Sequence, residues 1–441
     1  MSQAQTKIVK SVGGLHCAAV SDVGMRRANN QDSLAVAVAE DAELWASRGH
    51  LFVVADGMGA HAAGELASQI ATDSIPLTYQ KRRDLSPCES LVEAVRDANT
   101  RINTKGQNSV DFQGMGTTCS SLAILPGGAI AAHVGDSRVY RLRGEYFEQL
   151  TFDHSLVWEM AAAGQATEEE VPAYVPKNVI TRSLGPNSEV KVDLEGPFPL
   201  ESGDRFLLCS DGLTGPLNSQ LIGLILGSLP AEEAAQTLVD LANLLGGPDN
   251  ITVIVAEVKN VSQLGEASSE GPECNPPTTS GVPSAKRKSM AITVGLVGAL
   301  AAGGLMIAGK HLFGTLTAGV AVVAASLLAF LPKPVPTASA KLPGPQGKAP
   351  YRRYEASPSA EGIEPLTDIV RQLEDLESQR DWEFDWTDIH ADRGEAHQAI
   401  AQGNPRGAVV AYSRAVRRLM QAVRDSGPEP PSDSSINLGV D

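Results

Sequence analysis

The chain has 441 residues, of which 42% are hydrophobic and 20% charged, and its formal net charge is −16. This length allows two or three domains, and the acidic balance argues against nucleic-acid binding, which would need a basic face. The five cysteines show no pair or ligand spacing, so we expect no disulfide framework and a reducing compartment. No basic region followed by an apolar stretch opens the chain, so no signal peptide is predicted.

Residues 8–259 alternate between short apolar runs and helical patterns. Apolar residues at helical spacing predict helices over 62–79, 90–104, 220–229 and 231–245. Apolar runs predict strands over 51–55, 117–125, 129–134, 138–143, 206–210 and 251–258. Because the connections among 117–143 are short, we expect antiparallel hairpins there. Strands in blocks and helices in pairs favour a layered α+β domain with antiparallel sheets over a doubly wound parallel sheet.

The composition changes after residue 259. Residues 260–288 are rich in Ser, Gly, Pro, Thr and Glu, which predicts a disordered linker. Two uncharged runs fill residues 289–331 and are split only by Lys310-His311. Each has about the 20 residues that a helix needs to cross a bilayer. Because neither run has a polar face, we favour two transmembrane helices over a pair of buried core helices.

Basic residues flank both outer ends of these two runs. That symmetry predicts a re-entering hairpin in the plasma (inner) membrane, with the first domain and the C-terminus both in the cytoplasm. In the less favoured variant, one helix crosses the bilayer and the other lies elsewhere. The protein is thus expected to be a multi-pass membrane protein in contact with the lipid bilayer.

The C-terminal part is expected to comprise a Pro-rich linker (332–363), a helical region (364–425) and a disordered tail (426–441). Gly403-Asn404 followed by Ala408, Tyr412 and Ala415 resembles the second helix of a tetratricopeptide-type hairpin. Only one such unit is present, and repeats of this kind normally need several copies to be stable. A plain helical hairpin and a peptide-binding repeat are therefore both open, and either could contact a protein partner.

The strongest functional signal is a set of aspartates at the edges of strand-like apolar runs. The four are Asp56, Asp136, Asp211 and Asp249. Each alone is typical of a turn, but buried strands can deliver such carboxylates into one shared cleft. Hard oxygen ligands favour Mg²⁺ or Mn²⁺ over zinc. Two such ions about 4 Å apart can convert a bridged water to hydroxide at neutral pH.

Three further residues near the first strand carry suitable chemistry. Arg27 has a planar fork that can hold a phosphate, although its spacing alone also fits a surface charge. Asp32 adds another carboxylate before the strand. His61 follows Asp56 by five residues; a lone His is usually structural or exposed, but beside a metal cluster it can donate a proton.

A series of short motifs follows in order along the first domain. They are Ser21-Asp22-Val23-Gly24, the segment Arg27 to Asp32, the segment Asp56 to Glu65, Gly116-Thr117-Thr118, the segment Val134 to Arg138, Leu150-Thr151, Asp153-His154-Ser155, the segment Ile180 to Gly185, Ser210-Asp211-Gly212-Leu213 and Asp249-Asn250. The ordered set resembles the metal-dependent Ser/Thr protein phosphatases of type 2C, bacterial branch, and covers roughly residues 10–258. The fold that this resemblance implies is two antiparallel β-sheets packed as a sandwich and flanked by helix pairs.

The resemblance implies a role for each metal-binding candidate. Asp56 would bridge two Mn²⁺ or Mg²⁺ ions, and the Gly57 carbonyl would bind one of them. Asp211 and Asp249 would complete this core pair. Asp136, together with Asp211, matches a looser third metal site. A hydroxide bridging the two core ions would attack the phosphorus in line, without a phosphoenzyme intermediate.

The same resemblance implies three catalytic roles. Arg27 would clamp the substrate phosphate, Asp32 would orient metal-bound water, and His61 would protonate the departing Ser or Thr oxygen. Residues 162–177 match a variable flap that influences substrate choice. Gln31 stands where many relatives have Glu, and Ala60 replaces a common Gly; neither change removes a metal ligand.

The expected function is a membrane-anchored phosphatase that hydrolyses phosphoserine and phosphothreonine in proteins. The resemblance points to Ser/Thr kinases or their substrates as its phosphorylated partners, and no nucleic acid is expected. The alternative is a catalytically weak scaffold at the membrane that binds phosphoproteins. Degenerate members would be expected to lose a metal ligand, and this chain keeps Asp56, Asp211 and Asp249, so we favour the enzyme.

Overall fold

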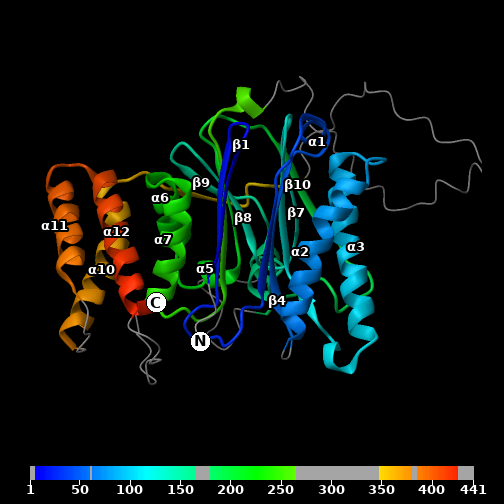
Figure 1. Ribbon diagram of the computed structural model, residues 1–441, viewed down its shortest axis with the longest axis horizontal. Coiled ribbons are helices and arrows are strands. Elements are labelled where there is room, and N and C mark those ends of the chain that lie inside the picture. The colour runs from blue at the N-terminus through cyan, green and yellow to red at the C-terminus, as the bar shows by residue number, and fades with distance from the viewer. Residues whose placement is uncertain (1–4, 60–61, 165–178, 265–346, 380–384, 426–441) are drawn as a thin grey trace, which may run out of the picture. The chain divides into compact units, whose positions relative to one another are not determined.

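The computed structural model describes residues 5–59, 62–164, 179–264, 347–379 and 385–425, drawn in colour in Figure 1. Within these ranges, none of the helices is both long and apolar enough to cross a membrane. The predicted transmembrane runs (289–331), His61, residues 165–178 of the predicted flap and the predicted tail (426–441) lie outside the described residues.

Two antiparallel sheets form the centre of the first domain (Figure 1). Sheet A contains, in spatial order, β1 (Thr6–Val12), β2 (Leu15–Asp22), β12 (Ile251–Val258), β11 (Arg205–Cys209), β8 (Arg138–Arg143), β9 (Tyr146–Gln149) and β13 (Arg352–Glu355). Sheet B contains β10 (Asp193–Phe198), β7 (Gly128–Val134), β6 (Cys119–Leu125), β4 (His50–Met58) and β3 (Asp32–Ala37), with β5 (Gly116–Thr117) paired to β4. The predicted α+β class with two antiparallel sheets is confirmed.

The central strands β6, β7 and β12 are buried on both faces, because each sheet packs against the other sheet on one face and against helices on the other. Along β12, Ile254 and Ala256 contribute to the core between the sheets, whereas Val253 and Val255 face the helices that cover sheet A. Side chains of a strand alternate between its two faces, so such a strand needs apolar residues at every position. This explains why the sequence shows continuous apolar runs and no polar alternation.

Helix pairs cover the outer faces of the sheets. The helices α2 (Ala63–Lys81) and α3 (Pro87–Gln107) share an apolar core with sheet B, and α6 (Ser219–Ser228) and α7 (Ala231–Leu244) share one with sheet A. At the start of α3, Ser86 and Glu89 form a capping box, which satisfies backbone N–H groups of the first turn. The shorter helices are α1 (Ala42–Arg48), α4 (Leu156–Ala162), α5 (Asp211–Thr214) and the 3₁₀ turns η1 (Val110–Phe112) and η2 (Val261–Leu264).

The connection between β7 and β8 corrects one expectation. The runs 129–134 and 138–143 do not form a hairpin, because β7 pairs with β6 and β10 in sheet B while β8 pairs with β9 and β11 in sheet A. The chain changes sheets at Gly135, whose φ is +112°. A Cβ at this position would lie 2.6 Å from side-chain atoms of Thr118, so the corner requires glycine.

The C-terminal part returns to sheet A. Strand β13, inside the range 332–363 for which a linker is expected, pairs antiparallel with β9. It has only four residues and no apolar alternation, so the local sequence gives no strand signal. It leads into α10 (Ala360–Gln379), α11 (Thr387–Ala401) and α12 (Pro405–Asp425). The helical hairpin expected here corresponds to α11 and α12, and Ala408, Tyr412 and Ala415 are buried.

Candidate active site

The aspartates singled out in the sequence lie close together where the two sheets meet. Asp32 and Asp56 are register partners on β3 and β4. Asp211 begins α5 directly after β11, and Asp136 follows the corner after β7. The charges of Asp32, Asp211 and Asp136 all act on Asp56, and the side chains of Asp56 and Asp211 share a hydrogen bond. Asp249, just before β12, acts on both Asp32 and Asp211.

Burial and mutual repulsion disfavour ionisation of this cluster. Burial raises the pKa of Asp32 to about 7, against hydrogen bonds from Ser210 and Thr252, and neighbouring carboxylates raise it further. Burial and the charge of Asp211 raise the pKa of Asp136 to about 8. The pKa of Asp56 is raised well above its usual range, again by burial first and by neighbouring carboxylates second. Several buried carboxylates can be ionised together only if a cation offsets their charge.

Unpartnered oxygens support a cation at this cluster. Within the described residues, Oδ1 of Asp32, Oδ1 of Asp136 and Oδ1 of Asp211 are buried and have no hydrogen-bond partner. Buried polar atoms of this kind are costly unless another ligand satisfies them. In the same ranges, no three His, Cys, Asp or Glu side chains are already gathered as a finished metal site. Like charges resist closer approach, so the donor set fits hard divalent cations that would draw the oxygens together.

Gly57 is held where only glycine fits. Its N–H donates to the Gln31 carbonyl at 3.1 Å, and a Cβ would lie 2.1 Å from the Gly64 carbonyl oxygen. The strand β4 therefore packs directly on the start of α2 at this point. Packing thus explains why a glycine follows Asp56. The ligand role of the Gly57 carbonyl is implied separately by the family resemblance.

Two threonines that the sequence analysis gave no role fix the position of Asp56. The Asp56 N–H donates to Oγ1 of Thr118 at 2.9 Å, and the Thr118 N–H donates back to the Asp56 carbonyl at 2.8 Å. The Thr117 hydroxyl donates to the same carbonyl at 2.9 Å. These bonds lock the Asp56 backbone against β5 and β6. The motif Gly116-Thr117-Thr118 is visible in the sequence, but its partner across 60 residues is not.

Asp32 is oriented by a serine from the other sheet. The Ser210 hydroxyl donates to Oδ2 of Asp32 at 2.7 Å and accepts the Thr252 N–H at 3.0 Å. Ser210 precedes Asp211, so one short segment both supplies a candidate ligand and fixes a second carboxylate. Oδ1 of Asp32 is buried and lacks a hydrogen-bond partner in the described residues.

The loop that carries Arg27 is tied down by Asn250. The Asn250 amide donates to the carbonyls of Val23 at 2.8 Å and Asn29 at 3.0 Å, and its Oδ1 accepts the Gln31 N–H at 2.7 Å. Within this loop, Nη2 of Arg27 lies 2.7 Å from Oδ2 of Asp249. The Arg27 side chain is 49% exposed, so its other donors are accessible to a ligand.

The charges of a buried ion pair, which the sequence analysis did not assign, act on Asp136. Nη2 of Arg138 lies 2.7 Å from Oδ2 of Asp153, and their side chains are 16% and 3% exposed. The Gly135 N–H donates to Nδ1 of His154 at 2.9 Å. Nε2 of His154 in turn lies 2.9 Å from Oδ2 of Asp193. Together, these contacts fix the corner that presents Asp136.

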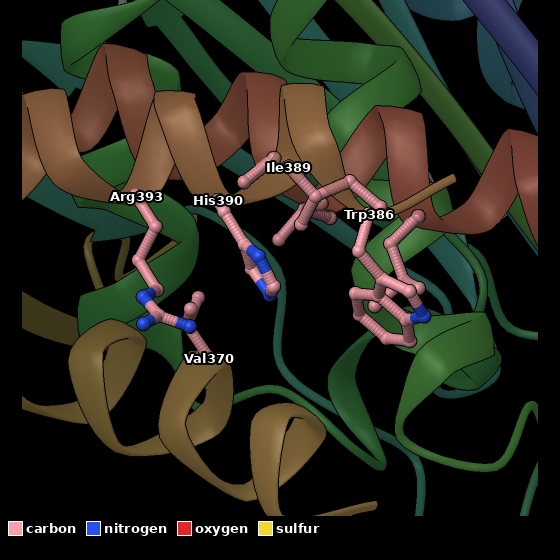
Figure 2. A pocket seen from close by; sticks show the side chains of 8 residues that line it. Val370, Trp386, Ile389, His390 and Arg393 are labelled. Atoms are coloured by element: carbon pink, nitrogen blue, oxygen red, sulfur yellow. The ribbon is translucent and has the colours of Figure 1, made fainter. Parts of the chain in front are cut away.

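A separate apolar pocket lies among the C-terminal helices. Figure 2 shows His390 and Arg393 of α11 projecting toward Val370 of α10. The remaining lining comes from Trp386, Ile389, Ala415, Val416 and Leu419. None of the predicted site residues lines this pocket, so it is not part of the carboxylate site.

Over its first domain, the chain is similar to known protein phosphatases. The model of the Protein phosphatase 2C family matches residues 25–246. Protein phosphatase PhpP of Streptococcus pneumoniae is 39% identical over 248 residues, which are 54% of this chain and 96% of PhpP. A solved structure of the S. agalactiae serine/threonine phosphatase is 37% identical, covers 55% of this chain and 99% of its own, and has a TM-score of 0.51. The catalytic domain of the phosphatase PstP, solved in complex with two manganese ions, is 35% identical over 56% of this chain and 99% of its own, with a TM-score of 0.48.

Proposed function

The chain belongs to the protein phosphatase 2C family, and from that premise we propose that it is a membrane-anchored protein Ser/Thr phosphatase with a two-metal active site. As a member it is a metal-dependent phosphoprotein phosphatase, and its metal ions are Mn²⁺ or Mg²⁺. The observation that carries the site assignment is the buried cluster of Asp32, Asp56, Asp136 and Asp211, three of which have an unpartnered oxygen within the described residues. The charge of Arg27 acts on Asp211 in this cluster.

In this proposal, Asp56, the Gly57 carbonyl, Asp211 and Asp249 would hold the two core ions. Asp136 and Asp211 would hold a third, weaker one. The bound ions would supply a nucleophile derived from water at neutral pH, together with positive charge against the phosphate. The chain's own contribution is a rigid frame, because the hydrogen bonds of Thr118 and Ser210 keep two of the carboxylates in fixed positions.

The remaining roles follow from where each side chain lies. Arg27 is half exposed and pairs with Asp249, so a phosphate that binds beside Asp249 can take the second edge of its guanidinium group. Asp32 has one oxygen bonded to Ser210, so its other oxygen can accept a hydrogen bond from a water molecule and orient it. We assign protonation of the leaving Ser or Thr oxygen to His61 on the family resemblance.

The experiment is hydrolysis of an aryl phosphate by the full chain with added Mn²⁺ or Mg²⁺. We expect activity that excess chelator removes and that Asp211→Asn lowers by at least about 100-fold, because charge stabilisation is the largest catalytic contribution in such sites. Asp97→Asn, at an exposed pair with Arg101, serves as the control and should be fully active. Normal activity of Asp211→Asn, or activity in chelator, would refute the metal mechanism. Binding of phosphoproteins without hydrolysis would support the scaffold alternative.

We further propose that residues 289–331 form a hairpin in the plasma membrane, with both flanking parts in the cytoplasm. The support is the length of the two uncharged runs and the basic residues at both outer ends. Such an anchor would raise the local concentration near a membrane Ser/Thr kinase, so we propose that kinase or its targets as substrates. Compartment-sensitive reporters at each terminus test the hairpin, and reporters on opposite sides of the membrane would contradict it. That the C-terminal helices bind a separate protein stays a prediction.

A further inference from the structure

The last described helix, α12, joins α7 through two ion pairs of similar geometry. Nη2 of Arg417 lies 2.7 Å from Oε2 of Glu233, and Nη2 of Arg424 lies 2.6 Å from Oδ1 of Asp240. The steps from 417 to 424 and from 233 to 240 are both seven residues, or about two helical turns. The two helices therefore run parallel and side by side, as Figure 1 shows, over one shared apolar core.

The two ion pairs differ in how deeply their carboxylates are buried. The Glu233 side chain is 43% exposed, so its pair with Arg417 is a surface contact. The Asp240 side chain is only 2% exposed. Burial raises the pKa of Asp240, and the charge of Arg424 opposes that rise. A buried carboxylate depends on its cation far more than an exposed one does.

Arg424 also reaches the start of the loop that carries Arg27. The same Nη2 atom lies 3.5 Å from Oδ2 of Asp22, whose side chain is 12% exposed. Asp22 is the last residue of β2, and its Oδ1 accepts the amide of Asn243 at 3.0 Å and the N–H of Gly24 at 2.9 Å. The Arg424 guanidinium group thus connects α12 both to α7 and to the loop that carries Arg27.

The turn after Asp22 has little freedom to move. Gly24 has a φ of +80°, and a Cβ there would lie 2.1 Å from the Asp249 carbonyl oxygen. The N–H groups of the next two residues donate to the Gly247 carbonyl at 2.9 and 3.2 Å. Arg27 follows directly and pairs with Asp249. A shift of Asp22 would therefore be passed on through a rigid turn to Arg27.

We propose that Arg424 is a positioning residue for Arg27, so that the C-terminal helix α12 is part of the phosphate-binding machinery. The proposal rests on the proposed role of Arg27 in holding the substrate phosphate. The residues that provide this support, 405–425, lie outside the family match at 25–246. In this chain, substrate binding therefore depends on a segment that the family match does not include.

The test compares Arg424→Ala and Arg424→Lys with the matched control Arg417→Ala, all in the full chain with saturating Mn²⁺. The measurements are kcat and KM for a phosphothreonine peptide and the inhibition constant of inorganic phosphate. We expect Arg424→Ala to raise both KM and the phosphate inhibition constant about fivefold, with kcat changed less than about twofold. Arg424→Lys should restore most of the affinity because it keeps the cation. Arg417→Ala should lower the melting temperature while leaving both affinities unchanged.

If Arg424→Ala does not fold, the variant Asp22→Asn still tests the proposal. Asp22→Asn leaves the Arg424–Asp240 pair intact but places an amide where Oδ2 now accepts the Gln5 side chain and faces Arg424. It should also weaken phosphate inhibition. Equal effects of Arg424→Ala and Arg417→Ala, or unchanged phosphate inhibition in Asp22→Asn, would overturn the proposal.

A double-mutant cycle separates this proposal from the proposed function. In an Arg27→Ala background, Arg424→Ala should cause no further loss of phosphate affinity; a further loss of the same size would overturn the positioning role. If Arg27→Ala alone leaves phosphate inhibition unchanged, the assigned role of Arg27 fails. If the wild-type chain shows no metal-dependent hydrolysis, the proposed function itself fails.

Discussion

The replacement Gly135→Ala tests how the corner between the sheets supports the site. The residue has a φ of +112°, and a Cβ would lie 2.6 Å from Cβ and Cγ2 of Thr118. The backbone conformation costs an L-residue about 1–2 kcal/mol, and the overpacking adds about 1–3 kcal/mol. We therefore expect the free energy of unfolding to fall by about 2–5 kcal/mol. Activity should also fall, because the displaced Thr118 holds the Asp56 N–H and the corner presents Asp136.

Gly144→Ala is the matched control for this replacement. Gly144 also has a positive φ, +57°, but nothing lies within 4 Å of a Cβ placed there. It should lose only about 1–2 kcal/mol, the conformational cost alone, and keep full activity. Urea unfolding and Mn²⁺-dependent hydrolysis measure the two effects. If Gly135→Ala destabilises the chain no more than Gly144→Ala and leaves hydrolysis intact, the account of the corner is refuted.

Three further predictions concern the site. Arg27→Ala should raise KM for a phosphopeptide about tenfold or more, whereas Arg26→Ala should not; equal steady-state constants for the two variants would contradict the clamp. Ser210→Ala removes the 2.7 Å hydrogen bond to Asp32 and should lower kcat about tenfold with little change in Mn²⁺ affinity; an unchanged kcat would show that this bond does not orient the carboxyl. Because burial raises the pKa of Asp32 to about 7 and of Asp136 to about 8, the folded metal-free chain holds protons that the unfolded chain has lost above about pH 4. Its melting temperature in chelator should therefore fall from pH 5 to pH 8, and saturating Mn²⁺ should remove most of that fall; identical pH profiles with and without Mn²⁺ would contradict a metal at these carboxylates.

The sequence predicted the elements whose signals are local. The helical spacing of apolar residues located α2, α3, α6 and α7 to within a few residues, and continuous apolar runs located β12. Strand pairing between segments that are distant in the sequence has no local sequence pattern. The change of sheet at Gly135 looks like a hairpin connection in the sequence. The pairing of β13 with β9 joins residues about 200 positions apart through backbone hydrogen bonds that any residue type can make.

The site residues also fall into those with a local sequence signal and those whose partners are distant in the sequence. Asp56, Asp136 and Asp211 were predicted because several aspartates recur at the edges of apolar runs in one domain, although each alone is typical of a turn. Thr118 and Ser210 were quoted within motifs but given no role, because their partners lie across the fold. Arg424 was not singled out, since an arginine near the end of an amphipathic helix looks like any exposed charge. Its importance follows only from the burial of the carboxylate that it meets.

Calorimetric titration of the metal-free full chain with Mn²⁺ tests the central claim most directly, because it counts ions without depending on turnover. We predict at least two ions per chain for the wild type. Asp56→Asn should lose the tight binding, and Asp136→Asn should lose only the weakest site while the core pair remains. The same stoichiometry and affinity in the wild type and in Asp56→Asn would contradict the claim that these converging aspartates form the metal centre.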